Sequence, residues 1–103
     1  NDSLTVYIEE HGAQKIEQYR KRHGEISVVL LDLSMPLMSG TEVYDKLKEI
    51  REDVCIIITS GHPKEMAMRS FRGKEIYDFL KKPFRAADLM TKVNEAMREC
   101  AAE

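Results

Sequence analysis

The chain has 103 residues, a formal net charge of −2 at pH 7 and a pI near 6.0, which is the size of one domain with a single core. This charge balance argues against nucleic-acid binding, because the basic cluster Arg20-Lys21-Arg22 falls on a helix that is polar over most of its surface. No apolar stretch approaches the roughly 18–20 residues of a membrane span, and no signal-peptide pattern is present. We therefore expect one cytoplasmic domain whose direct partners are neither nucleic acid nor membrane.

The apolar pattern predicts four successive units, each a strand followed by a helix. Strands are expected at residues 4–9, 27–32, 54–59 and 76–80, and helices at residues 13–23, 39–50, 63–71 and 85–100. Ser39 with Glu42 three residues later forms a capping-box pattern for the second helix. Alternating strands and helices imply a parallel sheet joined by right-handed crossovers. The strands at 27–32 and 54–59 are almost wholly apolar, so we expect them in the centre and the two mixed strands at the edges.

The two cysteines, Cys55 and Cys100, fall in a strand pattern and on the apolar stripe of a helix. Both are expected to act as small core hydrophobes, because they lack the paired spacing of a metal site and do not suggest a disulfide framework. A reducing cytoplasm is the simplest compartment for such a chain.

Polar residues end the last three predicted strands. Asp32 closes the apolar run 28–31, Thr59-Ser60 closes the next strand, and Lys82 follows the fourth. Because parallel strands bring their carboxyl ends to one crevice, we expect these residues to converge there. A carboxylate in that place can be an acyl-phosphate nucleophile, while a hydroxyl and an ammonium bind the transferred group. The alternatives are a solvated Asp32 that begins a turn and an ordinary surface Lys82.

Three segments in this order carry a resemblance to a known family. They are Leu31-Asp32 with Met35-Pro36 and Gly40, then Ile58-Thr59-Ser60-Gly61-His62, then Lys82-Pro83-Phe84. Ser60 and Lys82 follow Asp32 by 28 and 50 residues. From residue 4 to about residue 100 the chain resembles the receiver domain of two-component response regulators, in particular those attached to hybrid sensor histidine kinases. The resemblance implies a flavodoxin-like (CheY-like) α/β fold, a parallel sheet with helices on both faces.

The resemblance also implies roles for the residues that bind the phosphoryl group. Asp32 matches the phosphoacceptor, and Lys82 matches the lysine that contacts the phosphoryl group. Ser60 matches the hydroxyl residue that moves toward that group, and is preferred to Thr59 because a glycine directly follows it. Phe79 matches the aromatic residue whose rotamer reports activation, with core packing as the alternative role.

Further matches concern the metal and the lifetime of the phosphoryl group. Asp32 and the backbone carbonyl of Ser34 match ligands of Mg²⁺, a cation that favours oxygen ligands and retained waters. Ser34 and His62 stand where family members tune access of the hydrolytic water, although His62 is better explained as a loop residue. Lys82-Pro83 is a candidate for a cis peptide bond.

The chain departs from the family at its beginning. Aligned on Asp32, it starts at the family's second strand, so the first strand and helix are absent and residues 1–103 form a partial receiver. The acidic pair that holds Mg²⁺ is then missing, which puts phosphorylation in doubt. Glu9-Glu10 resembles such a pair, but we do not assign it as a ligand, because Gly12 and the helix after it fit the second unit better.

The missing strand is central in the family's sheet order of 2-1-3-4-5. Its loss is expected to leave unpaired backbone edges and a large exposed apolar face. Three arrangements would resolve this: an N-terminal segment beyond the given sequence, a strand donated by a second chain in a swapped dimer, or direct pairing of the flanking strands. We favour the first, because the rest of the site is intact.

We expect a phosphoacceptor signalling domain and not a metabolic enzyme, with a sensor histidine kinase or a histidine phosphotransfer protein as partner and Mg²⁺ as cofactor. One alternative is a pseudo-receiver, an interaction module that accepts no phosphate. The other is a phosphohydrolase with an Asp nucleophile, which would usually carry a second acid where this chain has Ser34.

Overall fold

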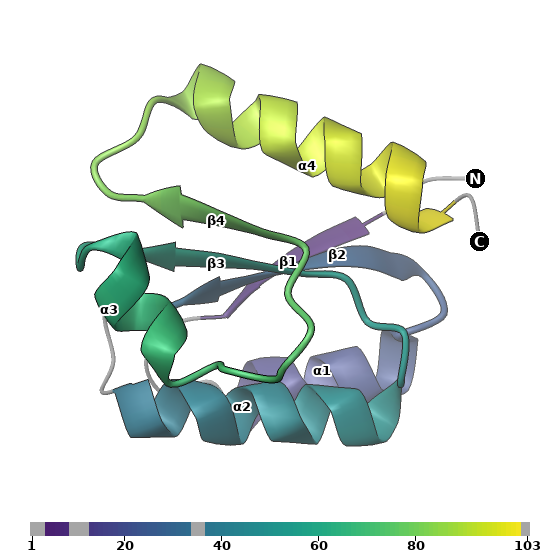
Figure 1. Cartoon of the computed structure of the whole chain (residues 1–103). Helices are drawn as coiled ribbons and strands as arrows, with labels where there is room; N and C mark the ends of the chain where they lie inside the picture. The colour runs from purple at the N-terminus through teal and green to yellow at the C-terminus, as the bar shows by residue number, and fades with distance from the viewer. Residues whose placement is uncertain (1–3, 9–12, 34–36, 102–103) are drawn as a thin grey trace.

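A parallel four-stranded sheet lies between two layers of helices in the computed structural model, which describes residues 4–8, 13–33 and 37–101 (Figure 1). The strands are β1 (Leu4–Ile8), β2 (Ile26–Asp32), β3 (Ile56–Ser60) and β4 (Asp78–Lys81). The helices are α1 (Ala13–Arg22), α2 (Leu37–Ile50), α3 (Lys64–Arg69) and α4 (Ala86–Ala101). The expected order of strands and helices is confirmed. None of the described helices is both long and apolar enough to cross a bilayer.

The strands follow one another across the sheet in chain order, β1-β2-β3-β4, and each neighbouring pair is parallel. The apolar strands β2 and β3 are central and the mixed strands are at the edges, as predicted. β1 pairs directly with β2, from Leu4 opposite Ile26 to Ile8 opposite Leu31. Direct pairing is therefore the arrangement that this chain adopts. The expectation of unpaired backbone edges between these strands is wrong, because β1 and β2 satisfy one another's hydrogen bonds.

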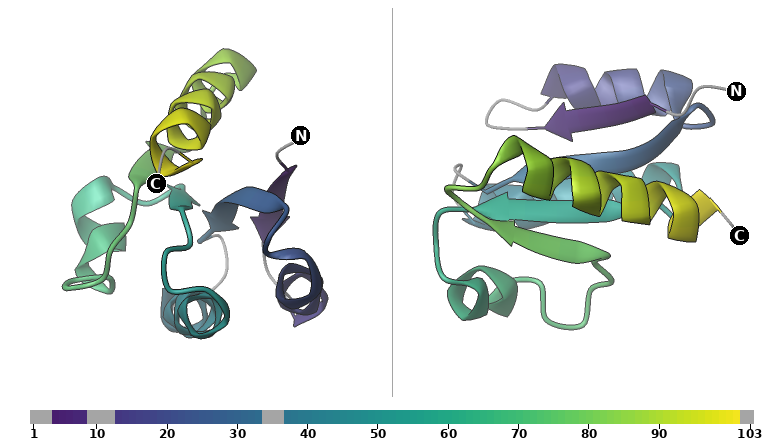
Figure 2. Two further views of the ribbon diagram at one scale, coloured as in Figure 1. Left: turned by 90° about the vertical axis from the view of Figure 1, so that its right-hand side faces the viewer. Right: turned by 90° about the horizontal axis from the view of Figure 1, so that it is seen from above.

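The helices divide unequally between the faces of the sheet. α1, α2 and α3 cover one face, and α4 alone among the described helices covers the other (Figures 1 and 2). The core under α4 is made by buried residues of both central strands and of the helix, namely Val28, Leu30, Cys55, Ile57, Val93 and Ala96. The expected exposed apolar face is therefore wrong for the described side chains. The narrowed sheet lets a single helix of 16 residues cover its two central strands.

The start of α2 is packed tightly against the end of β2. The helix begins at Leu37, so Ser39 lies inside its first turn and the predicted capping box is wrong. Gly40 is buried, and a Cβ atom at this position would collide with Cδ2 of Leu33. Glycine therefore allows the first turn of α2 to approach the residue that directly follows Asp32.

Candidate functional site

Asp32 is the last residue of β2 and is 3% exposed. Burying a carboxylate among apolar residues is costly unless a partner compensates its charge. Lys82 supplies that partner, because its Nζ lies 2.8 Å from Oδ2 of Asp32 and donates a hydrogen bond to it. The Lys82 side chain is 34% exposed, so the ion pair connects a buried carboxylate to the surface at the carboxyl end of the sheet.

The backbone holds Lys82 beside the end of β3. Its N–H donates a hydrogen bond to the carbonyl of Ser60 at 2.7 Å, directly after β4 ends at Lys81. The Lys82–Pro83 peptide bond is cis. On the other side, Leu33 donates its N–H to the carbonyl of Thr59 at 2.8 Å. The ends of β2, β3 and β4 are thus joined in one row, and the structure brings Asp32, Ser60 and Lys82 to one edge of the sheet.

Two buried hydroxyl groups lie at the end of β3. Ser60 is fully buried, and its Oγ accepts a hydrogen bond from the N–H of His62 at 3.0 Å. Thr59 is also fully buried, but its hydroxyl has no hydrogen-bond partner among the described residues. Thr59 is paired in register with Asp32, so alternation along the strands puts both side chains on one face of the sheet and Ser60 on the other. The family resemblance did not identify Thr59 as a site residue. The register of β2 and β3 does, because it pairs Thr59 with Asp32.

Phe79 is half-buried in β4 and packs against the core beneath α1, α2 and α3. It is paired in register with Ile58, which lies two residues before Ser60. Because residues two apart on a strand share a face, Phe79 and Ser60 lie on the same side of the sheet. A movement of the Ser60 side chain would therefore change the packing on the face of the sheet that the Phe79 ring occupies.

The remaining predicted site residues contribute less to the described geometry. His62 is exposed and contacts the site through its backbone N–H. Ser34, Glu9 and Glu10 lie outside the described residues. Within residues 4–8, 13–33 and 37–101, no group of three or more His, Cys, Asp or Glu side chains could hold a metal ion. Mg²⁺ is commonly held by one or two carboxylates together with waters and phosphate oxygens, so Asp32 could supply one ligand of such a site.

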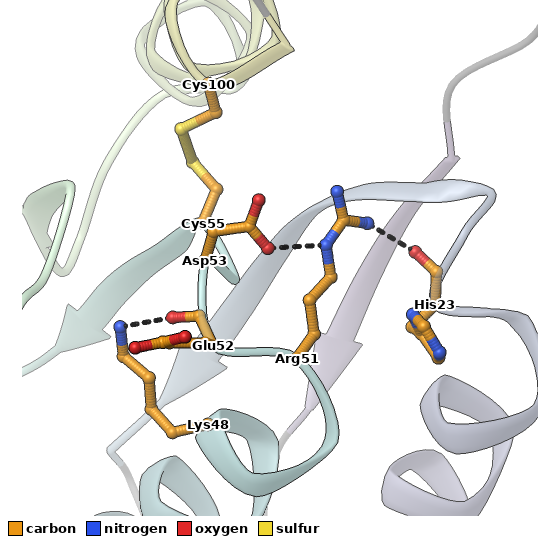
Figure 3. A network of polar contacts seen from close by, with 7 residues as sticks. All are labelled: His23, Lys48, Arg51, Glu52, Asp53, Cys55 and Cys100. Atoms are coloured by element: carbon orange, nitrogen blue, oxygen red, sulfur yellow. Dashed lines mark hydrogen bonds and ion pairs between the residues drawn. A yellow bond between two sulfur atoms is a disulfide. The ribbon is translucent and has the colours of Figure 1, made fainter. Parts of the chain in front are cut away.

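The opposite end of the sheet contains a feature that the sequence did not predict. A disulfide joins Cys55, just before β3, to Cys100 in the last turn of α4, with the two Cα atoms 6.3 Å apart (Figure 3). The expectation that both cysteines are only core hydrophobes is therefore wrong, although Cys55 is 5% exposed and belongs to the core. The correction has a simple cause. α4 runs back antiparallel to the strands, so its last turn returns to the amino end of the sheet (Figure 1) and comes within disulfide reach of Cys55.

Arg51 connects the helices and the sheet at this same end (Figure 3). Its Nε donates to Oδ1 of Asp53 at 2.7 Å, and its Nη1 donates to the carbonyl of His23 at 2.8 Å. The hydrogen bond and charge of Arg51 lower the pKa of Asp53, and the same hydrogen bond raises the pKa of Arg51. Burial raises the pKa of the neighbouring Tyr19 to about 12, so its hydroxyl is neutral over the physiological range.

Comparison with known proteins agrees with this geometry. A sequence profile described as the response regulator receiver domain matches residues 2–94. The chain is 41% identical over 71 residues to the response regulator protein TmoT of Ectopseudomonas mendocina, covering 68% of this chain and 32% of that protein. It is 28% identical over 95 residues to the sensor kinase CckA of Brucella abortus, covering 92% of this chain and 10% of that protein. The chain thus spans between a tenth and a third of these curated relatives.

Solved structures share the fold at lower sequence identity. The signal receiver domain of a putative LuxO repressor protein from Vibrio parahaemolyticus superposes with a TM-score of 0.75 at 21% identity, covering 99% of this chain and 95% of that one. CheY in the CheX–CheY–BeF₃–Mg²⁺ complex from Borrelia burgdorferi superposes with a TM-score of 0.70 at 19% identity, covering 89% and 87% of the two chains.

The fold therefore defines the class: a flavodoxin-like α/β domain whose carboxyl edge carries a buried acid, hydroxyl groups and a lysine. Within that class, the chain belongs to the response regulator receiver domain family. Receiver domains are phosphoacceptor signalling domains of two-component systems, and the family binds Mg²⁺.

Proposed function

We propose that Asp32 is the phosphoacceptor of this receiver and takes its phosphoryl group from a phosphohistidine on a sensor histidine kinase or a histidine phosphotransfer protein. The observation that carries the proposal is the buried carboxylate at the end of β2, which Lys82 contacts at 2.8 Å beside the hydroxyl-bearing end of β3. An ammonium fixed beside the nucleophile matches the need of phosphoryl transfer for positioning and charge neutralisation.

The transfer follows from these groups. A carboxylate oxygen of Asp32 attacks the phosphorus atom, and the P–N bond to the donor imidazole breaks. The imidazole nitrogen leaves with the electron pair, and Asp32 becomes an acyl phosphate. The Lys82 ammonium, which neutralises the carboxylate before transfer, then stabilises the equatorial phosphoryl oxygens. Ser60 would exchange the hydrogen bond from the His62 N–H for one that its own hydroxyl donates to the phosphoryl group.

We propose Mg²⁺ as the cofactor, with Asp32 and the backbone carbonyl of Ser34 among its ligands. When bound, the metal supplies positive charge to the phosphoryl oxygens. Because the described residues contain no group of three or more side chains that could hold a metal ion, magnesium dependence is the part of the proposal that an experiment should test first. We propose further that Ser34 and His62 set the lifetime of the acyl phosphate by controlling access of water.

The proposed output is a change of surface. Withdrawal of Ser60 toward the phosphoryl group frees space on the face that it shares with Phe79. An inward rotation of the half-buried ring would then shift the surface built from residues 64–72, 76–80 and 85–100 between two states.

We propose that the domain is cytoplasmic, and that it turns over no metabolite.

A second candidate, a receiver that works as an interaction module without phosphate, is favoured by the incomplete set of metal ligands among the described residues. In that case the Asp32–Lys82 ion pair would only hold the strand ends together.

Intact mass spectrometry after incubation with a small-molecule phosphodonor separates the two functions. With Mg²⁺ we expect one phosphoryl group per chain, none after Asp32→Asn, and none when the metal is chelated. Asp45→Asn is the matched control, because Asp45 is an exposed acid on α2 paired with Lys74 at 2.9 Å, and it should be labelled like the wild type. Labelling of Asp32→Asn at the wild-type level would rule out the phosphoacceptor assignment, and an unlabelled wild type would favour the interaction module.

A further inference from the structure

The Cys55–Cys100 disulfide lies at the end of the sheet opposite Asp32 and has no part in the proposed phosphoryl transfer. Cys55 is buried in the core under α4, whereas Cys100 is only half-buried. Cavities of about 220, 400 and 270 Å³ all include Cys100 in their lining, and the first and third also include Cys55. Both half-cystines line cavities at this end, and Cys100 is the more accessible of the two because it is half-buried whereas Cys55 is 5% exposed.

The disulfide holds the last turn of α4 to the sheet. Further back along the helix, Val93 and Ala96 are buried in the core and Met97 packs against it. Beyond them, the described contacts of the last turn are the packing of Cys100, its disulfide and a hydrogen bond from the Tyr77 hydroxyl to Oε1 of Glu99 at 2.7 Å. Opening the disulfide would thus free this turn while leaving the rest of the helix packed.

We propose that this disulfide is a thiol–disulfide exchange site, opened by a dithiol reductant that attacks Cys100. A thiolate of the reductant attacks Sγ of Cys100, and Sγ of Cys55 leaves as a thiolate and takes up a proton from solvent. The second thiol of the reductant then attacks the mixed disulfide, releasing Cys100 as a thiol. The protein disulfide is reduced to two thiols, and the reductant dithiol is oxidised to a disulfide.

Compartment and topology both support an exchange role. In a reducing cytoplasm, the disulfides that do form are usually transient and redox-active. This argument rests on the proposed cytoplasmic location of the domain. The accessibility of Cys100 is independent of that location. α4 is the one described helix on its face of the sheet (Figure 2). The exchange would therefore loosen one end of that cover without touching the strand ends that carry Asp32 and Lys82.

The test is reduction of the folded wild-type chain by dithiothreitol, followed by acid quenching and alkylation in denaturant. We expect two alkyl groups per chain, gained faster than the chain unfolds in the same buffer. Reduction that proceeds only at the rate of unfolding would overturn the proposal, because it would make the bond an inaccessible brace. Two alkyl groups on air-oxidised protein without reductant would overturn it as well.

Two further readouts test the direction of attack and its consequence. A monothiol should be trapped as a mixed disulfide on Cys100; trapping on Cys55 would contradict the assignment. Amide hydrogen exchange should lose protection in residues 97–101 on reduction, with β2 and β3 unchanged. Tyr77→Phe is the matched control, because it removes the other described tie of the last turn and keeps the disulfide. Since phosphorylation is not measured, failure here would leave the proposed function untouched.

Discussion

The two ends of the sheet hold their charged groups differently. At the amino end, charged groups are exposed or half-buried and are tied to near neighbours, as Arg51 is to Asp53 and to the His23 carbonyl, and a covalent bond closes the gap to α4. At the carboxyl end, the carboxylate of Asp32 is buried and is paired with the ammonium of Lys82. Buried atoms without a hydrogen-bond partner among the described residues occur at both ends, at Nδ1 of His23 and at the hydroxyl of Thr59. The contrast therefore separates an end held by surface ion pairs and a disulfide from an end that carries a buried carboxylate.

Removal of the disulfide should have the largest effect on stability. Its half-cystines are 45 residues apart, and closing a loop of that length stabilises a chain by about 3–4 kcal/mol in the chain-entropy model. We expect Cys100→Ser to lower the free energy of unfolding in urea by about this amount. Reduced wild-type protein is the control and should match the variant. Equal stability of the oxidised wild type and the variant would show that the brace contributes nothing.

Breaking the Asp32–Lys82 ion pair at the carboxyl end of the sheet should have the second-largest effect on stability. Lys82→Met leaves the Asp32 carboxylate buried without its cation, which costs about 3–5 kcal/mol for a fully buried pair. Because Lys82 is about one-third exposed, solvent screening reduces our expectation to about 2 kcal/mol. Urea unfolding measures the change, and the double variant Asp32→Asn with Lys82→Met should recover most of it. A double variant as unstable as Lys82→Met would mean that the lysine acts through packing.

Thr59→Val should raise stability. Valine has the shape of threonine, and it removes a fully buried hydroxyl that has no hydrogen-bond partner within the part of the chain that the structure describes, so we expect a gain of up to about 1 kcal/mol. Ser60→Ala is the contrasting variant, because it deletes the acceptor of the His62 N–H and should lose about 1 kcal/mol. Thermal unfolding of both variants shows whether each substitution raises or lowers stability. A destabilised Thr59→Val would show that this hydroxyl is satisfied in solution.

The smallest expected effect is a dependence of stability on pH. Arg51 lowers the pKa of Asp53 below its ordinary value of 3.8, so this carboxylate binds a proton less readily in the folded chain than in the unfolded one. Its contribution is complete above the unfolded pKa and is lost as pH falls through the folded pKa. Urea midpoints of Asp53→Asn and wild type should therefore differ at pH 7 and converge as the pH falls through the lowered pKa of Asp53 in the folded chain. A difference that persists in acid would assign the effect to packing.

Much of this architecture follows from local patterns. The apolar runs that contain Val29 and Ile57 predicted the two central strands, and the spacing of Val93 and Ala96 predicted the helix that buries them. The convergence of Asp32 and Lys82 also followed, because parallel strands align their carboxyl ends. These features depend on periodicity and chain direction, which a sequence displays directly.

The features that escaped prediction depend on distances between elements. Pairing of β1 with β2 could not be distinguished from two other arrangements, because each satisfies the same hydrophobic pattern. Cys55 and Cys100 are far apart in the chain and meet only because α4 has the length to return to the amino end. The position of Thr59 on the face of Asp32 required the register of β2 and β3. Gly40 was named only among the residues of the family resemblance, because its close approach to Leu33 is a matter of packing.

The order of strands in this sheet has a consequence for folding. Every strand lies beside the strand that precedes it in the chain, so no pairing has to wait for a segment made much later. Contacts between segments close in sequence form with a small loss of loop entropy and favour rapid folding. During synthesis, each strand-and-helix unit could dock on the edge left by the one before it. Packing of the last turn of α4 would then be the last packing step among the described elements, and the Cys55–Cys100 disulfide would close after it.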